Sequence, residues 1–118
     1  MVCMGNICRS PMAEHVFRTK ANVAGLEVEV ASAGTGGWHV GDPADYRTVA
    51  VLNAHGYTSD HRAQQFNPDW FDFFDLIAVM DKDNLRRVQE QASDQASRDK
   101  VRLLRSFDPN APHEAEIP

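Results

Sequence analysis

The stretch Cys3-Met4-Gly5-Asn6-Ile7-Cys8-Arg9-Ser10-Pro11 has the form C-x5-R-S-P and follows only two residues, Met1 and Val2. Ser10 followed by Pro11 is typical of a helix start, because serine accepts hydrogen bonds from free backbone N–H groups and proline fits the first helical turn. Met1 and Val2 predict the end of a strand. The stretch therefore predicts a loop that leaves a strand and enters a helix, named here the C-x5-R loop (residues 3–9).

Such a loop suits anion binding, because backbone N–H groups at a helix N-terminus point to one place. Gly5 and Asn6 tolerate backbone conformations that other residues resist. The planar guanidinium of Arg9 matches two oxygens of a phosphoryl group. Cys3 would lie at the base of the loop, where the same dipoles stabilise a thiolate placed for in-line attack on phosphorus.

The alternative is that both cysteines are small buried side chains and Arg9 is a surface charge. The strand–loop–helix context around the motif favours the phosphate-binding interpretation. A Walker-type loop is excluded, because no G-K-[ST] follows.

Outward from this loop, helical and strand patterns alternate, which is typical of an α/β fold. We expect a doubly wound parallel sheet of four strands flanked by helices, with ligands bound at the carboxyl ends of the strands. The patterns predict a helix over 10–24, a strand over 26–30, a loop over 32–41, a helix over 42–55, a short helix over 67–72, a strand over 76–80, a helix from 81 and a strand over 101–104.

Composition limits the class of protein. The 118 residues have 42% apolar side chains and a net charge of −5, typical of one globular domain spanning 1–118. The acidic balance argues against broad binding of nucleic acid or membrane surfaces. We expect a cytoplasmic protein, because two cysteines form no disulfide scaffold. We expect no metal, because the five histidines show no metal-ligand spacing. We also expect a monomer without cofactor.

Four blocks of sequence resemble the low-molecular-weight protein tyrosine phosphatases. They are VCMGNICRSPMAE (2–14), SAGTGGWHVG (32–41), NAHGYTSDHRAQQ (53–65) and LIAVMDKDN (76–84). The Gly-Trp-His and His-Arg-Ala-Gln segments resemble actinobacterial members most. The resemblance implies a phosphotyrosine phosphatase I-like fold and a bacterial enzyme that hydrolyses phosphotyrosine in proteins through a phosphocysteine intermediate.

The resemblance also implies a role for each residue of the motif. Cys3 would be the nucleophile, and Ser10 would hydrogen-bond its sulfur. Cys8 could form a reversible disulfide with Cys3 and protect it from over-oxidation. The phosphoryl group would be bound by Met4, Gly5, Asn6, Ile7, Cys8, Arg9 and Ser10.

Further residues would support the loop or contact the substrate. Asn6 would hold the loop through side-chain bonds to Ser32 and His61. Trp38 and His39 would line the cleft that receives the aromatic ring of the substrate. Asp81 would have a structural role on the far side of this cleft.

The family's general acid, an aspartate in an Asp-Pro-Tyr-Tyr loop, is absent from the chain. Asp108-Pro109 is the alternative, although LLRSFDP (103–109) resembles the segment just before the acid loop. The resemblance implies that most of the first strand and the last helix are missing as well. We therefore expect this chain to be poorly folded alone and weakly active.

Three other functions stay open on the same scaffold. Arsenate reductases of the thioredoxin-coupled type need further cysteines, and none follows Cys8. Protein-arginine phosphatases carry threonine at the position of Ile7, whose apolar side chain suits the flat ring of phosphotyrosine. The third function is that of a catalytically silent phosphate-binding protein, because the general acid is missing.

Overall fold

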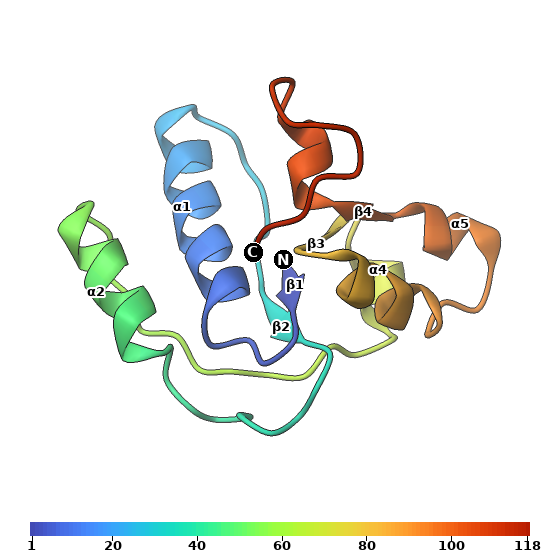
Figure 1. Cartoon of the computed structure of the whole chain (residues 1–118), viewed down its shortest axis with the longest axis horizontal. Coiled ribbons are helices and arrows are strands. Elements are labelled where there is room, and N and C mark those ends of the chain that lie inside the picture. The colour runs from blue at the N-terminus through green and yellow to red at the C-terminus, as the bar shows by residue number, and fades with distance from the viewer.

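The computed structural model describes all 118 residues and is built around one parallel four-stranded sheet (Figure 1). The strand order is β2-β1-β3-β4. The strands are β1 (Val2–Cys3), β2 (Ala33–Gly34), β3 (Ile77–Val79) and β4 (Val101–Leu103). The predicted fold class, an α/β protein with a parallel sheet of four strands, is confirmed.

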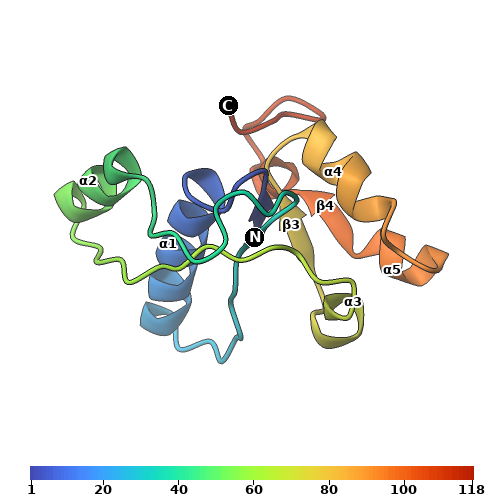
Figure 2. The same cartoon turned by 90° about the horizontal axis from the view of Figure 1, so that it is seen from below.

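Helices cover both faces of the sheet, as Figure 2 shows: α1 and α2 lie on one side, and α3, α4 and α5 on the other. Helix α1 packs on β1, β2 and α2, whereas α4 packs on β3 and β4. The helical elements are α1 (Arg9–Val23), α2 (Tyr46–Ala54), α3 (Trp70–Phe73), α4 (Lys82–Gln89), α5 (Gln95–Asp99) and the 3-10 helix η1 (Leu104–Phe107).

The apolar core lies under α3 and α4 and joins these helices to every strand. Phe66 packs edge-on against Trp70 and Phe71, which anchors the segment that leads into β3. The fully buried members of this cluster are Val2, Ala33, Phe66, Phe71, Ile77, Val79, Val88, Val101 and Leu103. Because each strand contributes to this cluster, the core fixes the carboxyl ends of β1 and β3 beside each other.

The predicted strand over 26–30 is wrong. This segment forms no strand, and Leu26 and Val28 are exposed where it crosses the surface from α1 towards the sheet. The paired strand is Ala33–Gly34, whose small residues lie directly against β1. An apolar residue at every second position is equally compatible with extended chain that no neighbouring strand pairs with.

The helix predicted over 10–24 is found within one residue, but Ser10 is not its cap. Helix α1 begins at Arg9 after Cys8, which makes no side-chain cap bond, and the buried Ser10 lies inside the first turn. The predicted start of the second helix is wrong. Helix α2 begins at Tyr46, four residues after the expected start, because Asp45 caps it by accepting a hydrogen bond from Arg47 N.

The close approach of β2 to the C-x5-R loop generates a testable prediction. A Cβ atom at Gly34 would lie 2.6 Å from Met4 O and 3.0 Å from Gly5 C. We expect Gly34→Ala to displace the loop, to lower the free energy of unfolding by about 1–3 kcal/mol and to weaken phosphate binding. Urea unfolding and phosphate titration by calorimetry measure both effects.

Gly37→Ala is the matched control, because its Cβ would meet only the end of the exposed Gln65 side chain, at 3.0 Å. Equal stability and equal phosphate affinity in the two variants would show that the close approach at Gly34 does not constrain the loop.

Candidate active site

The backbone of the C-x5-R loop turns its carbonyl oxygens outward to neighbouring elements. The bonds are Thr35 N to Cys3 O (2.9 Å), Gly36 N to Met4 O (2.9 Å), Asp45 N to Ile7 O (2.7 Å) and Met12 N to Cys8 O (3.3 Å). The N–H groups of residues 4–8 donate to no group of the chain. Because the carbonyls face outward, these N–H groups face the inside of the turn, which is the arrangement that binds an anion.

Asn6 holds the centre of this loop. Its φ angle is 58° and its side chain is fully buried. Both polar atoms of the side chain have hydrogen-bond partners. Nδ2 donates to Ser10 Oγ (2.8 Å) and Ser32 Oγ (2.9 Å), and Oδ1 accepts from Gln64 N (2.9 Å). His61 Nε2 is bonded to the main-chain oxygen of Asn6, not to its side chain as expected.

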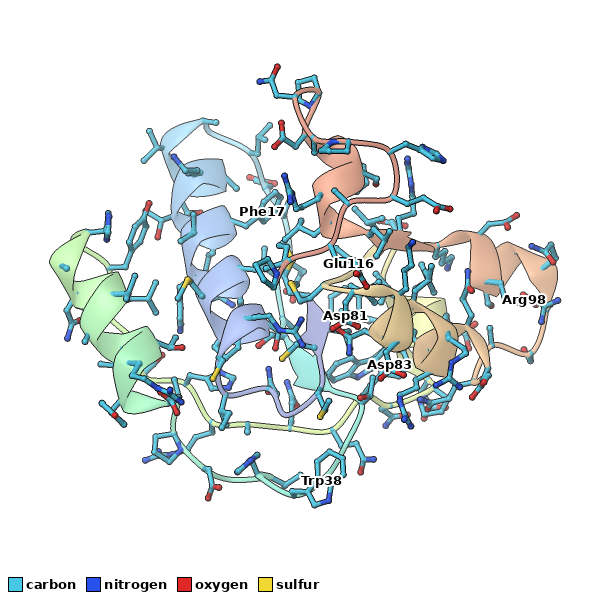
Figure 3. The ribbon with its side chains drawn as sticks, in the orientation of Figure 1. Phe17, Trp38, Asp81, Asp83, Arg98 and Glu116 are labelled. Carbon is cyan, nitrogen blue, oxygen red and sulfur yellow. The ribbon has the colours of Figure 1, made fainter.

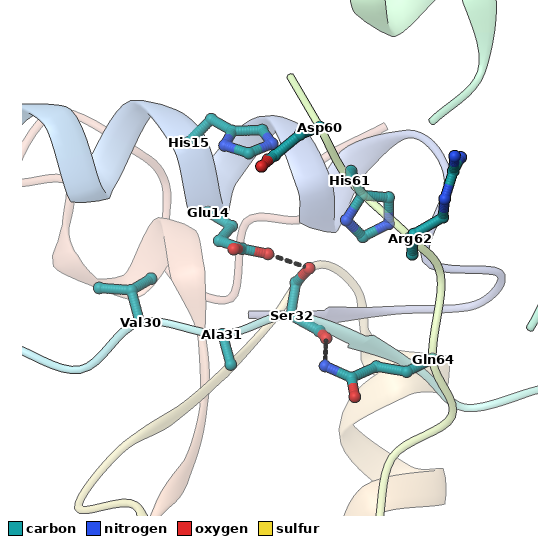
Figure 4. Close-up of a pocket in the computed structure, with 9 residues that line it drawn as sticks. All are labelled: Glu14, His15, Val30, Ala31, Ser32, Asp60, His61, Arg62 and Gln64. Carbon is teal, nitrogen blue, oxygen red and sulfur yellow. Dashed lines mark hydrogen bonds between the residues drawn. The ribbon is translucent and has the colours of Figure 1, made fainter. Parts of the chain in front are cut away.

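These bonds belong to a hydrogen-bonded chain, named here the donor chain, that runs from Glu14 through Ser32, Asn6 and Ser10 to Cys3. Because the amide of Asn6 donates to both hydroxyls, each hydroxyl hydrogen is left for another partner. Ser32 donates to the carboxylate of Glu14 (Figure 4). Ser10 Oγ lies 3.0 Å from the buried Cys3 Sγ and 3.4 Å from Ala33 O, and either atom can accept its hydrogen.

Glu14 was not foreseen from the sequence, although one signal pointed to it. It stands four residues after Ser10 and therefore on the same face of α1. Its carboxylate also pairs with Arg18 Nη2, which reaches Val30 O at 2.7 Å. Glu14 thus ties the donor chain to the body of the helix.

Behind this network lies a polar cavity of about 220 Å³ (Figure 4). Within it, His15 Nε2 lies 3.2 Å from Ser59 Oγ, and its ring meets that of His61 edge-on at 6.5 Å. The lining residues are Glu14, His15, Val30, Ala31, Ser32, Asp60, His61, Arg62 and Gln64. No residue of the C-x5-R loop lines this cavity, whereas Ser32, His61 and Gln64, which bond to Asn6, do.

Arg9 spans the point where the chain winds to opposite faces of the sheet. Its Nη1 donates to Asp81 Oδ2 (2.8 Å) and to Ile117 O (2.9 Å). Asp81 Oδ1 accepts from Asn84 N (2.8 Å) and so caps α4, at the place where the sequence predicts the start of a helix. The Nε and Nη2 atoms of Arg9 bond to no group of the chain, which leaves two donors for the oxygens of an anion.

Trp38 and His39 lie on the loop between β2 and α2. Trp38 is 73% exposed and its ring covers Gly36, where any Cβ atom would overlap it. The His39 ring lies beside Gly5 of the C-x5-R loop, and its Nδ1 is 3.1 Å from Asp42 Oδ2. Figure 3 shows Trp38 at the edge of the molecule. Substrate contact by these two side chains stays a prediction.

Asp108 has no bond to the C-x5-R loop. Its carboxylate accepts from Asn110 N (2.9 Å), and it lines a separate cavity of about 480 Å³ bounded by α4, β4 and residues 111–114. Both cysteines are free thiols, Cys3 buried and Cys8 half-buried. The Cys8 carbonyl is held by Thr48 Oγ at 3.4 Å, and a disulfide between Cys3 and Cys8 stays a prediction.

No group of three or more His, Cys, Asp or Glu side chains is arranged to hold a metal ion. A bilayer-crossing helix, long and apolar enough for the task, is also not found.

A buried thiol at the start of a loop whose N–H groups have no partner in the chain, at the switch point of a doubly wound sheet, gives this α/β protein a candidate anion site beside a cysteine. The family model described as low molecular weight phosphotyrosine protein phosphatase matches residues 1–118. The chain belongs to this family, as the sequence blocks predicted.

Known relatives agree with this assignment. A low molecular weight protein-tyrosine-phosphatase of the actinobacterium Streptomyces coelicolor is 56% identical over 110 residues, which cover 92% of this chain and 67% of the relative. A crystal structure of a protein tyrosine phosphatase from Entamoeba histolytica matches with a TM-score of 0.92 and 32% identity, over 99% of this chain and 75% of that one. The chain spans about two thirds of the length of the curated relatives it matches.

A third match bears on the substrate. The crystal structure of a Drosophila arginine phosphatase has a TM-score of 0.83 and 33% identity, over 89% of this chain and 69% of that one. The same architecture is thus found in a protein named for a different phosphorylated side chain.

The Asn6 network generates the second prediction. We expect Asn6→Ala to lower the free energy of unfolding by about 2–4 kcal/mol, because two buried hydroxyls and the Gln64 N–H lose their partner. Phosphate affinity should fall with it, since the left-handed backbone at this position is no longer supported. Asn53→Ala, on the exposed face of α2, should change neither quantity. Equal stability of the two variants would contradict this role of Asn6.

Proposed function

We propose that this chain hydrolyses phosphotyrosine in proteins through a phosphocysteine intermediate on Cys3. The observation that carries the proposal is that the N–H groups of residues 4–8 have no partner in the chain, on a loop that begins at the buried Cys3. Membership of the family supports the same chemistry.

The first step follows from the groups around the anion. The N–H groups of the loop and the free Nε and Nη2 of Arg9 bind the phosphoryl oxygens and stabilise the charge that develops on them. The thiolate of Cys3 attacks phosphorus as the bond to the phenol oxygen breaks. The leaving oxygen takes a proton from a general acid.

In the second step water attacks phosphorus and gives its proton to the group that acted as the acid, now its conjugate base. The P–S bond breaks, phosphate forms and the thiolate of Cys3 is released. The Ser10 hydroxyl, 3.0 Å from Cys3 Sγ, supports this departure because it donates to the sulfur as negative charge returns. Because Asn6 Nδ2 donates to this hydroxyl, its hydrogen is free to turn to the sulfur or to Ala33 O, 3.4 Å away. The same bond serves both steps.

Two side chains favour an aromatic substrate. Trp38 presents a large exposed ring, and Ile7 places a half-buried apolar side chain on the C-x5-R loop. A guanidinium substrate would find no polar side chain at Ile7, which favours phosphotyrosine over phosphoarginine. An arsenate reductase that relays a disulfide would need a thiol beyond Cys3 and Cys8, and the chain has none.

We also propose that the protein is a single-domain cytoplasmic monomer that binds neither nucleic acid nor membranes. The net charge of −5 supports the lack of nucleic-acid and membrane partners. Cys8, on the same loop as Cys3, is proposed as the redox partner that protects the nucleophile.

The third prediction concerns the nucleophile and the arginine. Cys3→Ser should reduce the hydrolysis of p-nitrophenyl phosphate to background, and Arg9→Lys should lower kcat/KM by about 100-fold or more, because lysine lacks the planar pair of donors. Steady-state kinetics with circular dichroism of each variant measure this. Activity retained by a folded Cys3→Ser protein would exclude the phosphocysteine route.

The fourth prediction concerns the general acid, since Asp81 is bonded to Arg9 and Asp108 has no contact with the loop. We expect kcat for phosphotyrosine to be about 100-fold below that for p-nitrophenyl phosphate, whose leaving group needs no proton. Asp108→Asn should leave this ratio unchanged. Equal kcat for the two substrates, together with a loss in Asp108→Asn that is confined to phosphotyrosine, would identify Asp108 as the acid. No turnover of either substrate by a chain that binds phosphate would favour a silent binding protein.

A further inference from the structure

The segment Glu114–Pro118, named here the C-terminal strap, crosses the carboxyl end of β3 and reaches the guanidinium of Arg9. Ile117 N donates to Met80 O (2.7 Å), and Ile117 O accepts from Arg9 Nη1 (2.9 Å). One residue therefore links the end of a central strand to the anion-binding arginine through its backbone alone.

The residue before it anchors the strap to α4. Glu116 Oε2 accepts from Lys82 N (2.7 Å), the first N–H of that helix, where a carboxylate is favoured by the helix dipole. The main-chain oxygen of Glu116 accepts from Arg105 Nη1 (3.2 Å). In Figure 3, Glu116 and Asp81 lie together at the start of α4.

The two contacts of Arg9 occupy one nitrogen. Nη1 carries two hydrogens, and Asp81 and Ile117 accept them, so the plane of the guanidinium is fixed by two acceptors. With Asp81 alone, the group could rotate about a single bond. With both acceptors, Nε and Nη2 are held in one direction, which bidentate binding of a phosphoryl group requires.

We propose that Glu116 is a positioning residue for Arg9: its carboxylate fixes the strap on α4 so that Ile117 O orients the guanidinium for phosphoryl binding. This deepens the proposed function and rests on it. Glu116 touches no substrate, and its effect passes through the backbone of its neighbour.

Inorganic phosphate binding, measured by calorimetry, tests this without turnover. Glu116→Gln should raise the dissociation constant for phosphate by about three- to tenfold, which is the size expected for a lost charge-assisted bond to a helix N-terminus. Glu114→Gln is the matched control, because it removes the same charge from the same strap. Glu114 is 60% exposed and pairs only with Lys82 Nζ at 3.4 Å, so this variant should bind phosphate as the unaltered chain does.

The donor side of the bond gives a second pair. Lys82→Pro removes the N–H that Glu116 accepts, at the first helical position after Asp81, whose extended backbone (φ −145°, ψ 174°) is compatible with a following proline. Lys82→Ala keeps the N–H and removes only the amine. Phosphate affinity should fall in Lys82→Pro and persist in Lys82→Ala, which carries the test even if Glu116→Gln fails to fold.

A double variant separates positioning from a general loss of structure. In an Arg9→Lys background, Glu116→Gln should cause no further change in the phosphate dissociation constant, because lysine has no guanidinium plane to orient. An unchanged dissociation constant in folded Glu116→Gln, an equal loss in Glu114→Gln, or the same fold-change with and without Arg9 would each overturn the proposal. Failure of the phosphatase function would appear separately, as phosphate binding that depends on Arg9 and Glu116 without hydrolysis by the unaltered chain.

Discussion

The side-chain amide of Asn6 is the interaction on which the site depends. A loop whose N–H groups all face inward loses the backbone partners that stabilise ordinary turns, so it needs other groups to hold it. Asn6 supplies them by bonding Ser10, Ser32 and Gln64 at once from a fully buried position. Its left-handed backbone, at φ 58°, reverses the chain at the same point. The cost of that conformation is offset by these three hydrogen bonds, two of which are buried.

The parallel sheet determines where this loop can lie. Because β1 lies between β2 and β3, the connections that leave β1 and β3 turn to opposite faces and open a space between them. Arg9 at the start of α1 and Asp81 at the start of α4 meet across this space. The ion pair thus joins the two halves of the fold beside the proposed anion site, and an arginine anchored on one nitrogen keeps two others for a ligand.

The sequence predicted the loop and the fold class because both are written in local patterns. The motif from Cys3 to Pro11 combines an anion-binding loop with a helix start, and the apolar run 76–80 is typical of a buried parallel strand. Strands β1 and β2 have two residues each, too few to show alternation, so the more regular segment 26–30 was mistaken for a strand. Asp42 was mistaken for the cap of α2 because the local pattern does not separate it from Asp45.

The supporting residues could be predicted only in part. Ser32 was expected from the family resemblance, whereas Glu14, Gln64 and Ile117 entered the site through contacts between distant parts of the chain. Ile117 bonds to Arg9 through its main-chain oxygen. Because every residue has this oxygen, the residue type at this position does not predict the contact.

Trapping of the intermediate tests the central claim most directly. After rapid acid quench of the chain with p-nitrophenyl phosphate, peptide mass spectrometry should find one phosphoryl group on the peptide that contains Cys3, and none in Cys3→Ser. A chain that releases p-nitrophenol while Cys3 never carries phosphorus, or that carries it on another residue, would contradict the claim that this loop performs nucleophilic phosphoryl transfer.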